Sequence, residues 1–182
     1  YTPGSIAFKR SINMKTKGDQ NVAFAHFIEH FPEVPLPVTL GDDSHHEFSR
    51  HNDPLPPRAI AQYIEPLEPP ETEEEFTEYI ACFRLPDAHE FIAVVYWRAH
   101  LMNYRYKLAT FTKSGQLIDT QIIAGTFSDG KTLTKSVAII GEDWEILIVS
   151  GQTEVGREEK YDASTSTTHQ LELLPDGIIV QT

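Results

Sequence analysis

The segment EFIAVVYWRAHLMNYRYKLATFTKSGQLID, residues 90–119, contains three consecutive runs of aliphatic, β-branched and aromatic residues separated by short turns. Runs of this kind are typical of β-strands. The same alternation extends from residue 79 to residue 182. It predicts an antiparallel meander with strands at residues 78–84, 90–98, 103–112, 116–124, 132–140, 144–150, 167–174 and 177–181. The predicted fold class is therefore mainly β, with about eight strands.

Tight turns join these predicted strands. Residues 113–115, 128–130, 141–143 and 175–177 each contain glycine or aspartate, which tolerate the positive φ that short hairpins need. Strands linked in this way form either an open curled sheet or an up-and-down barrel, depending on whether the last strand meets the first. The sequence leaves both forms open.

Two patterns predict how the sheet is covered. Residues 91–97 are apolar on both faces, as expected for a central strand with a helix over one side. Residues 104–108 alternate instead, because aromatic and aliphatic side chains share one face while Arg105 and Lys107 share the other. We therefore expect Arg105 and Lys107 to lie on a face exposed to solvent.

The first 75 residues predict short helices and connecting segments packed on a sheet formed by residues 76–182, in one compact domain. Apolar residues at helical spacing predict a first helix at residues 21–31. A proline in the first turn supports a second short helix at residues 58–64. Residues 1–20 lack periodic apolar positions and predict an arm.

Two polar segments complete this N-terminal region. Residues 41–53 carry almost no apolar periodicity and predict a long loop. Residues 65–75 are rich in proline and glutamate, and they predict a solvated surface link. Residues 76–83 also fit a helical spacing behind a capping box at Thr72 and Glu75, although we favour a strand there.

Composition limits the partners of the chain. Fifteen Lys and Arg against 27 Asp and Glu give the 182 residues a formal charge of -12 at pH 7, which repels phosphate backbones and anionic lipids. Nucleic acid and membrane surfaces are therefore not expected partners. No apolar run approaches the roughly 20 residues of a transmembrane helix. Cys82 is the lone cysteine and is expected to be a small buried hydrophobic residue.

The sharpest local motif is His26-Phe27-Ile28-Glu29-His30, which fits H-x-x-E-H. On a helix, the two imidazoles lie one turn apart and can share a zinc ion, and the carboxylate can accept a proton from bound water. In these five residues the chain resembles the inverzincin peptidases, which implies a metal-dependent hydrolase using His26, Glu29 and His30. Those enzymes need a further carboxylate ligand, which the sequence does not assign. The competing interpretation is that these residues form the solvent-facing side of the helix.

A second group of ligand-type side chains lies within the predicted loop 41–53. Its members are Asp42, Asp43, His45, His46, Glu47 and His51. Such a loop can bind zinc, nickel or copper weakly. Because no fixed ligand spacing is met, we expect no cofactor, with zinc as the alternative.

Residues 108–119, LATFTKSGQLID, predict a strand, a glycine turn and a second strand that ends at an aspartate. The pattern L-x-T-F-x-x-x-G-x-x-I-D resembles a hairpin of small uncharacterised β-rich bacterial proteins, often from the cell envelope. This resemblance implies a β-rich fold and a bacterial periplasm or cell envelope rather than the cytoplasm. The sequence begins at Tyr1 rather than at methionine, which fits a removed leader, a shortened chain or a start that the sequence does not include, so export is permitted but not shown.

The sequence contains no G-x-S-x-G nucleophile motif, and an enzyme is not the favoured interpretation. We expect a non-catalytic binding or accessory protein that acts through protein-protein contact. Leu101, Met102 and Tyr104, near a predicted hairpin bend, are the expected contact residues, because exposed apolar side chains mark contact sites. Alternatively, these residues only cap the core. The alternative functions are a barrel that holds a small apolar ligand and the metal-dependent hydrolase.

Overall fold

The structure is a computed structural model that describes residues 21–69, 77–156 and 165–182. The predicted N-terminal arm and the predicted capping box lie outside these residues, as does most of the predicted acidic link. Within the described residues, no helix is both long enough and apolar enough to cross a membrane.

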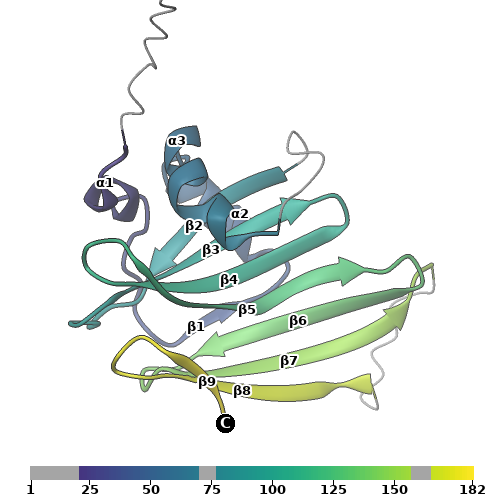
Figure 1. Cartoon of the computed structure of the whole chain (residues 1–182). Helices are drawn as coiled ribbons and strands as arrows, with labels where there is room; N and C mark the ends of the chain where they lie inside the picture. Colours follow the sequence, from purple (N-terminus) through teal and green to yellow (C-terminus); the bar gives the residue numbers. More distant parts are fainter. Residues whose placement is uncertain (1–20, 70–76, 157–164) are drawn as a thin grey trace, which may run out of the picture.

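One antiparallel sheet dominates the fold (Figure 1). Eight strands of the described chain follow one another in sequence order across the sheet, from β2 at one edge to β9 at the other. They are β2 (Thr77–Arg84), β3 (Ile92–His100), β4 (Asn103–Phe111), β5 (Leu117–Ser128), β6 (Thr132–Ile140), β7 (Glu145–Glu154), β8 (Thr167–Leu173) and β9 (Ile179–Gln181). The predicted antiparallel meander is confirmed, and its sheet is open rather than closed into a barrel.

A short strand, β1 (Val38–Leu40), lies outside this order and was not predicted. It pairs with residues 138–140 of β6, whereas β5 pairs with β6 only through residues 125–128. β1 and β5 therefore share one edge of β6. The two halves of the sheet, β2 to β5 and β6 to β9, diverge where the β5–β6 pairing ends (Figure 1).

Short helices lie over the end of the sheet formed by β2, β3 and β4 (Figure 1). They are α1 (Phe24–Ile28), α2 (Ser44–His51), α3 (Pro57–Ala59), the π-helical turn η1 (Ile60–Ile64) and the 3₁₀ turn η2 (Glu65–Leu67). The predicted first helix is present but shorter than predicted. The predicted second helix is found as α3 continued by η1.

The loop predicted for residues 41–53 is wrong, because α2 occupies its centre. The ring of Phe48 packs 5.5 Å from that of Phe83 on β2. At the end of the helix, the side-chain amide of Asn52 donates to the carbonyl oxygens of Ala81 and Cys82 at 2.7 Å each. These tertiary contacts hold a helix that has little apolar periodicity of its own.

Two hydrophobic cores lie on opposite faces of β3. Val95 and Trp97 belong to the core that continues into β6, β7 and β8. Val94 and Tyr96 belong to the second core, which lies beneath α1, α3 and η1. The predicted covering of this strand on both faces is confirmed. Cys82 is fully buried in the first core, as predicted, and burial raises the pKa of its thiol.

The prediction of a solvent-exposed face on β4 is partly wrong. Lys107 is 7% exposed, and its Nζ lies 3.0 Å from Oε1 of Glu68. Glu68 also lies 3.7 Å from Nε of Arg98, and it accepts a hydrogen bond from the hydroxyl of Tyr96. The start of the predicted surface link is therefore anchored by a buried carboxylate. The alternating sequence pattern did not predict the burial of Lys107, because a charged side chain is normally exposed unless a counter-ion is buried with it.

Candidate functional site

The hairpin between β3 and β4 ends in two exposed apolar side chains. Leu101 is 59% exposed and Met102 is 62% exposed. Tyr104, at the start of β4, and Phe127, which pairs with Asn103 from β5, are also exposed. We call the hairpin tip, Leu101 and Met102, together with Tyr104 and Phe127 on opposite faces of the sheet beside it, the contact surface. The predicted hairpin bend is confirmed, whereas its role in binding stays a prediction.

Leu101 adopts a positive φ of 51° at the tip of this hairpin. Glycine and asparagine favour such positions, because the Cβ of other residues approaches the neighbouring carbonyl oxygen. The hairpin therefore carries an exposed leucine where both solvation and backbone preference favour a different residue. Stability of the turn alone does not explain leucine at this position.

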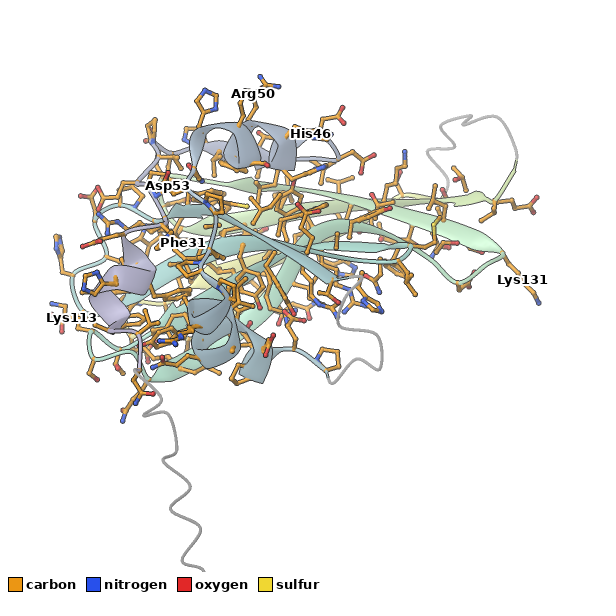
Figure 2. All side chains as sticks on the ribbon, turned by 90° about the horizontal axis from the view of Figure 1, so that it is seen from above. Phe31, His46, Arg50, Asp53, Lys113 and Lys131 are labelled. Atoms are coloured by element: carbon orange, nitrogen blue, oxygen red, sulfur yellow. The ribbon has the colours of Figure 1, made fainter. Side chains whose placement is uncertain are left out.

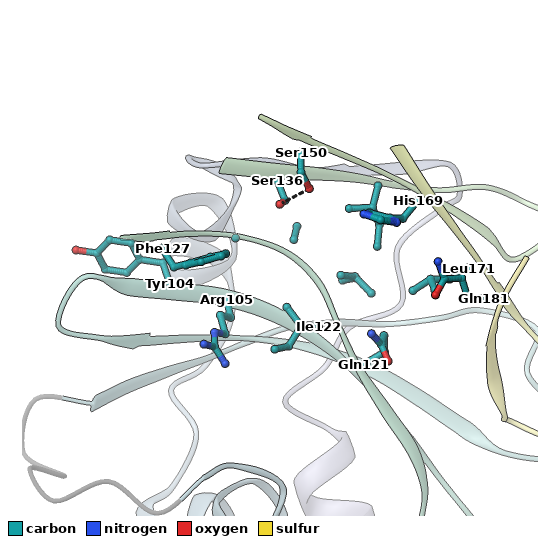
Figure 3. Close-up of a pocket in the computed structure, with 14 residues that line it drawn as sticks. Tyr104, Arg105, Gln121, Ile122, Phe127, Ser136, Ser150, His169, Leu171 and Gln181 are labelled. Atoms are coloured by element: carbon teal, nitrogen blue, oxygen red, sulfur yellow. Dashed lines mark hydrogen bonds between the residues drawn. The ribbon is translucent and has the colours of Figure 1, made fainter. Parts of the chain in front are cut away.

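An open cleft lies between the diverging halves of the sheet (Figure 3). Its volume is about 490 Å³, and apolar residues such as Ile123, Ile148 and Leu171 line it together with polar ones. Among the polar residues, Ser136 and Ser150 are hydrogen-bonded to each other at 2.7 Å (Figure 3). This cleft is the space that the open sheet offers in place of a barrel interior.

A second pocket, which we call the aromatic pocket, lies between α2 and the sheet. Its volume is about 440 Å³, and its lining includes His45, Trp97 and Tyr104. The imidazole of His45 stacks on the indole of Trp97, with ring centroids 4.1 Å apart and planes 2° from parallel. The ring of Tyr104 is also parallel to the indole, within 4°, at a centroid distance of 5.9 Å. Three aromatic planes thus share one orientation.

Polar residues from three elements also line the aromatic pocket. The carboxylate of Asp42, just before α2, lies 3.1 Å from Nζ of Lys135 on β6. The hydroxyl of Thr126 on β5 donates a hydrogen bond to the same carboxylate. Partial burial alone would raise the pKa of Asp42, but the bonds from Thr126 and Lys135 outweigh burial and hold it below its usual value. Asp42 is therefore ionised at neutral pH.

The position of His45 gives the fold a pH dependence. Burial, together with the neighbouring His46, lowers the pKa of His45 below its usual value. The stability contributed by neutral His45 is complete above the unfolded pKa of about 6.5 and is lost as the pH falls through the lower folded pKa. We expect the free energy of unfolding to decrease below about pH 6.5, as measured by urea denaturation at several pH values.

Two histidine variants check this expectation. The substitution His45→Gln should flatten the decrease, because glutamine does not titrate. The substitution His51→Gln provides the comparison, because His51 lies on the exposed side of α2 beside Glu47 and outside the aromatic pocket. An unaltered pH dependence in His45→Gln would assign the effect to other groups.

The residues of the H-x-x-E-H motif lie at the surface. His26 and Glu29 are exposed, with 3.6 Å between Nδ1 and the nearer carboxylate oxygen. Nδ1 of His30 donates to the backbone carbonyl of His26 at 2.9 Å rather than facing the other imidazole. In the described ranges, no group of three or more His, Cys, Asp or Glu side chains is arranged to hold a metal ion.

The second predicted ligand group is not brought together in one place, because its members lie in two different environments. The group consists of Asp42, Asp43, His45, His46, Glu47 and His51. Figure 2 shows His46 and Arg50 on the outer side of α2. Glu47 pairs there with Arg50 at 3.2 Å and with His51 at 3.6 Å. His45 instead stacks on Trp97 and lines the aromatic pocket with Asp42.

The aromatic pocket was not predicted from the sequence. Its residues come from distant positions, so that Asp42 and Thr126, for example, are separated by 84 positions. The one available signal was the aromatic spacing of Trp97, Tyr104 and Tyr106 on the predicted strands. That spacing does not reveal which segment covers the rings, because the covering helix was not predicted.

The chain belongs to the mainly β class, and its fold is an open antiparallel meander with short helices over one end. No family model, curated protein or solved structure matches it. A functional proposal therefore rests on the geometry of the contact surface, the cleft and the aromatic pocket.

Proposed function

We propose that the chain is a non-catalytic binding protein that contacts another protein through the contact surface. The observation that carries this proposal is the exposure of Leu101 and Met102 at the hairpin tip, with leucine in a positive-φ position. A partner that covers these side chains removes apolar area from water, which favours association. Tyr104 and Phe127 add aromatic area of the kind enriched in protein interfaces.

The chemistry of the chain also suggests what the partner presents. An apolar groove in the partner would receive the two side chains at the tip, as apolar anchors do at the centre of an interface. The formal charge of -12 favours a partner whose surface is neutral or basic. The resemblance carried by residues 108–119 supports a bacterial cell envelope as the setting of this proposal.

Two alternatives remain as weaker proposals. The apolar-ligand alternative now depends on the open cleft, whose volume falls within the range of about 300–1,000 Å³ typical of small-molecule sites. The hydrolase alternative lacks a metal-holding arrangement of His26, Glu29 and His30 among the described residues. Stoichiometric zinc in protein purified without chelator would favour it again.

The double substitution Leu101→Ala and Met102→Ala tests the main proposal. We expect it to reduce partner binding by at least about tenfold, because truncation of central apolar anchors costs more than truncation at the rim. The measurement is quantitative capture of proteins from the native extract by the immobilised full chain, wild type and variant compared. The matched control is Leu117→Ala, which truncates a leucine that is 46% exposed at the start of β5.

The test compares the proteins captured by the wild type, the double variant and the control variant. A protein captured by wild type and by Leu117→Ala, but lost from the double variant, supports the proposal. Equal capture by all three chains contradicts it. Thermal denaturation of each variant shows whether the hairpin substitutions leave the fold intact, which we expect because both side chains lie outside the two cores.

A further inference from the structure

The aromatic pocket combines an aromatic wall with side chains that form hydrogen bonds. The rings of Trp97 and Tyr104 are parallel; Trp97 is 6% exposed and stacks against His45, so Tyr104, which is 36% exposed, provides the accessible part of the aromatic wall. Asp42, Thr126 and Lys135 line the same space. A ligand that fills this pocket therefore meets an apolar flat surface and a cluster of donors and acceptors at once.

The charges in the pocket favour an uncharged ligand. Asp42 and Lys135 form an ion pair at 3.1 Å, so a cation or an anion would meet one attractive and one repulsive group at similar distances. Both side chains of the pair are partly exposed, at 46% and 39%, and so remain accessible to a hydroxyl group. A neutral hydroxyl can donate to the carboxylate and accept from the ammonium group.

The polar side chains that line the pocket favour a ligand with several hydroxyls over a flat arene. Nδ1 of His45 is buried, so the polar groups that a ligand can reach are those of Asp42, Thr126 and Lys135. An arene would stack on Tyr104 but would displace water from Asp42, Thr126 and Lys135 without forming hydrogen bonds to them in its place, which disfavours binding. A sugar ring offers a C–H face for the aromatic wall and hydroxyls for the polar side chains.

We propose that the aromatic pocket binds an uncharged sugar ring, stacked on the aromatic wall and hydrogen-bonded to Asp42, Thr126 and Lys135. The volume of about 440 Å³ is typical of a small-molecule site. This site does not depend on the protein-contact proposal, although Tyr104 belongs to both. For a single ring in an open pocket, we expect a Kd on the order of 1 mM.

Titration of the ¹⁵N-labelled full chain with methyl β-D-glucopyranoside, cellotriose and maltotriose tests the proposal by NMR. We expect at least one of these sugars to shift the indole N–H signal of Trp97. The signal of Trp144 provides an internal control, because this residue lies at the β6–β7 turn and packs against Phe91 instead. Indole, acetate and tetramethylammonium serve as planar, anionic and cationic comparison ligands.

The substitution Asp42→Ala should weaken sugar binding by about tenfold or more, because it removes a charged hydrogen-bond acceptor. Asp43→Ala, the neighbouring position outside the pocket, should bind as wild type does. Thr126→Val gives a second test if Asp42→Ala does not fold. The Leu101→Ala, Met102→Ala variant should still bind the sugar, which separates this site from the contact surface.

Three results would overturn the sugar assignment. The first is a Trp97 signal that none of the three sugars moves in the folded wild type. The second is equal sugar affinity in wild type and in the folded Asp42 or Thr126 variant. The third is tighter binding of indole, acetate or tetramethylammonium than of every sugar tested, which would assign the pocket to that class of ligand instead.

Discussion

Replacement of Glu68 by alanine is expected to destabilise the fold by about 3–5 kcal/mol, because it leaves buried cations without their counter-ion. The side chain of Glu68 is 3% exposed, and those of Lys107 and Arg98 are 9% and 2% exposed. The carboxylate also accepts a hydrogen bond from the hydroxyl of Tyr96, whose pKa is raised far above its usual value by burial. Urea denaturation of wild type and variant measures the difference.

The matched control is Glu65→Ala, because Glu65 belongs to the same acidic segment but is exposed. We expect its effect to stay within about 0.5 kcal/mol, as for most surface substitutions. A small effect of Glu68→Ala would mean that water reaches Lys107 and Arg98 and solvates them. In that case, the anchoring of this segment would depend on apolar contacts rather than on the carboxylate.

The substitution Gly125→Ala is expected to cost at least about 2 kcal/mol, because the position combines a backbone clash with a strained φ. Gly125 has a φ of +151°, and a Cβ placed there would lie 2.2 Å from the carbonyl oxygen of Tyr104. The backbone atoms of Gly125 and Tyr104 cannot move apart without separating β5 from β4. Gly125 also lines both the cleft and the aromatic pocket, so we expect both to be distorted.

Gly151→Ala provides the comparison for this prediction. A Cβ at Gly151 would meet no atom within 4 Å, and its φ is not in the positive region. We expect a change of at most about 0.5 kcal/mol, because neither clash nor strain arises. Equal stability of the two alanine variants in thermal denaturation would show that β5 shifts away from Tyr104 at little cost.

The strands of the meander were predictable because each carries its own signal in the chain. Alternation, β-branched residues and glycine or aspartate turns are local properties, and each predicted strand matches an observed one in position. Helix α2 carries no such signal, because Phe48 is its one large apolar residue and the contact that holds it comes from β2. Strand β1 also carries no local signal, because three residues are too few to show an alternation of apolar and polar positions.

The candidate sites likewise differ in whether a local sequence signal predicts them. Leu101 and Met102 were predicted because a hairpin bend exposes whatever residues occupy it. The aromatic pocket depends on His45 stacking on Trp97, a contact between the unpredicted helix and a predicted strand. Similarly, the burial of Lys107 depends on Glu68 from a segment whose composition indicates a solvated link. Sequence patterns report local periodicity, whereas these sites depend on which distant segment covers which strand.

The pairing of strand β1 with β6 joins segments that lie far apart in the chain. The hairpins of the meander join neighbouring strands, and such local pairs form quickly. β1 pairs with a segment of β6 about 100 positions later in the chain, which requires the closure of a much longer loop. During synthesis, β1 therefore leaves the ribosome well before the partner edge exists. We expect it to join last, and until then the edge of β6 beyond the β5 pairing stays open to another chain.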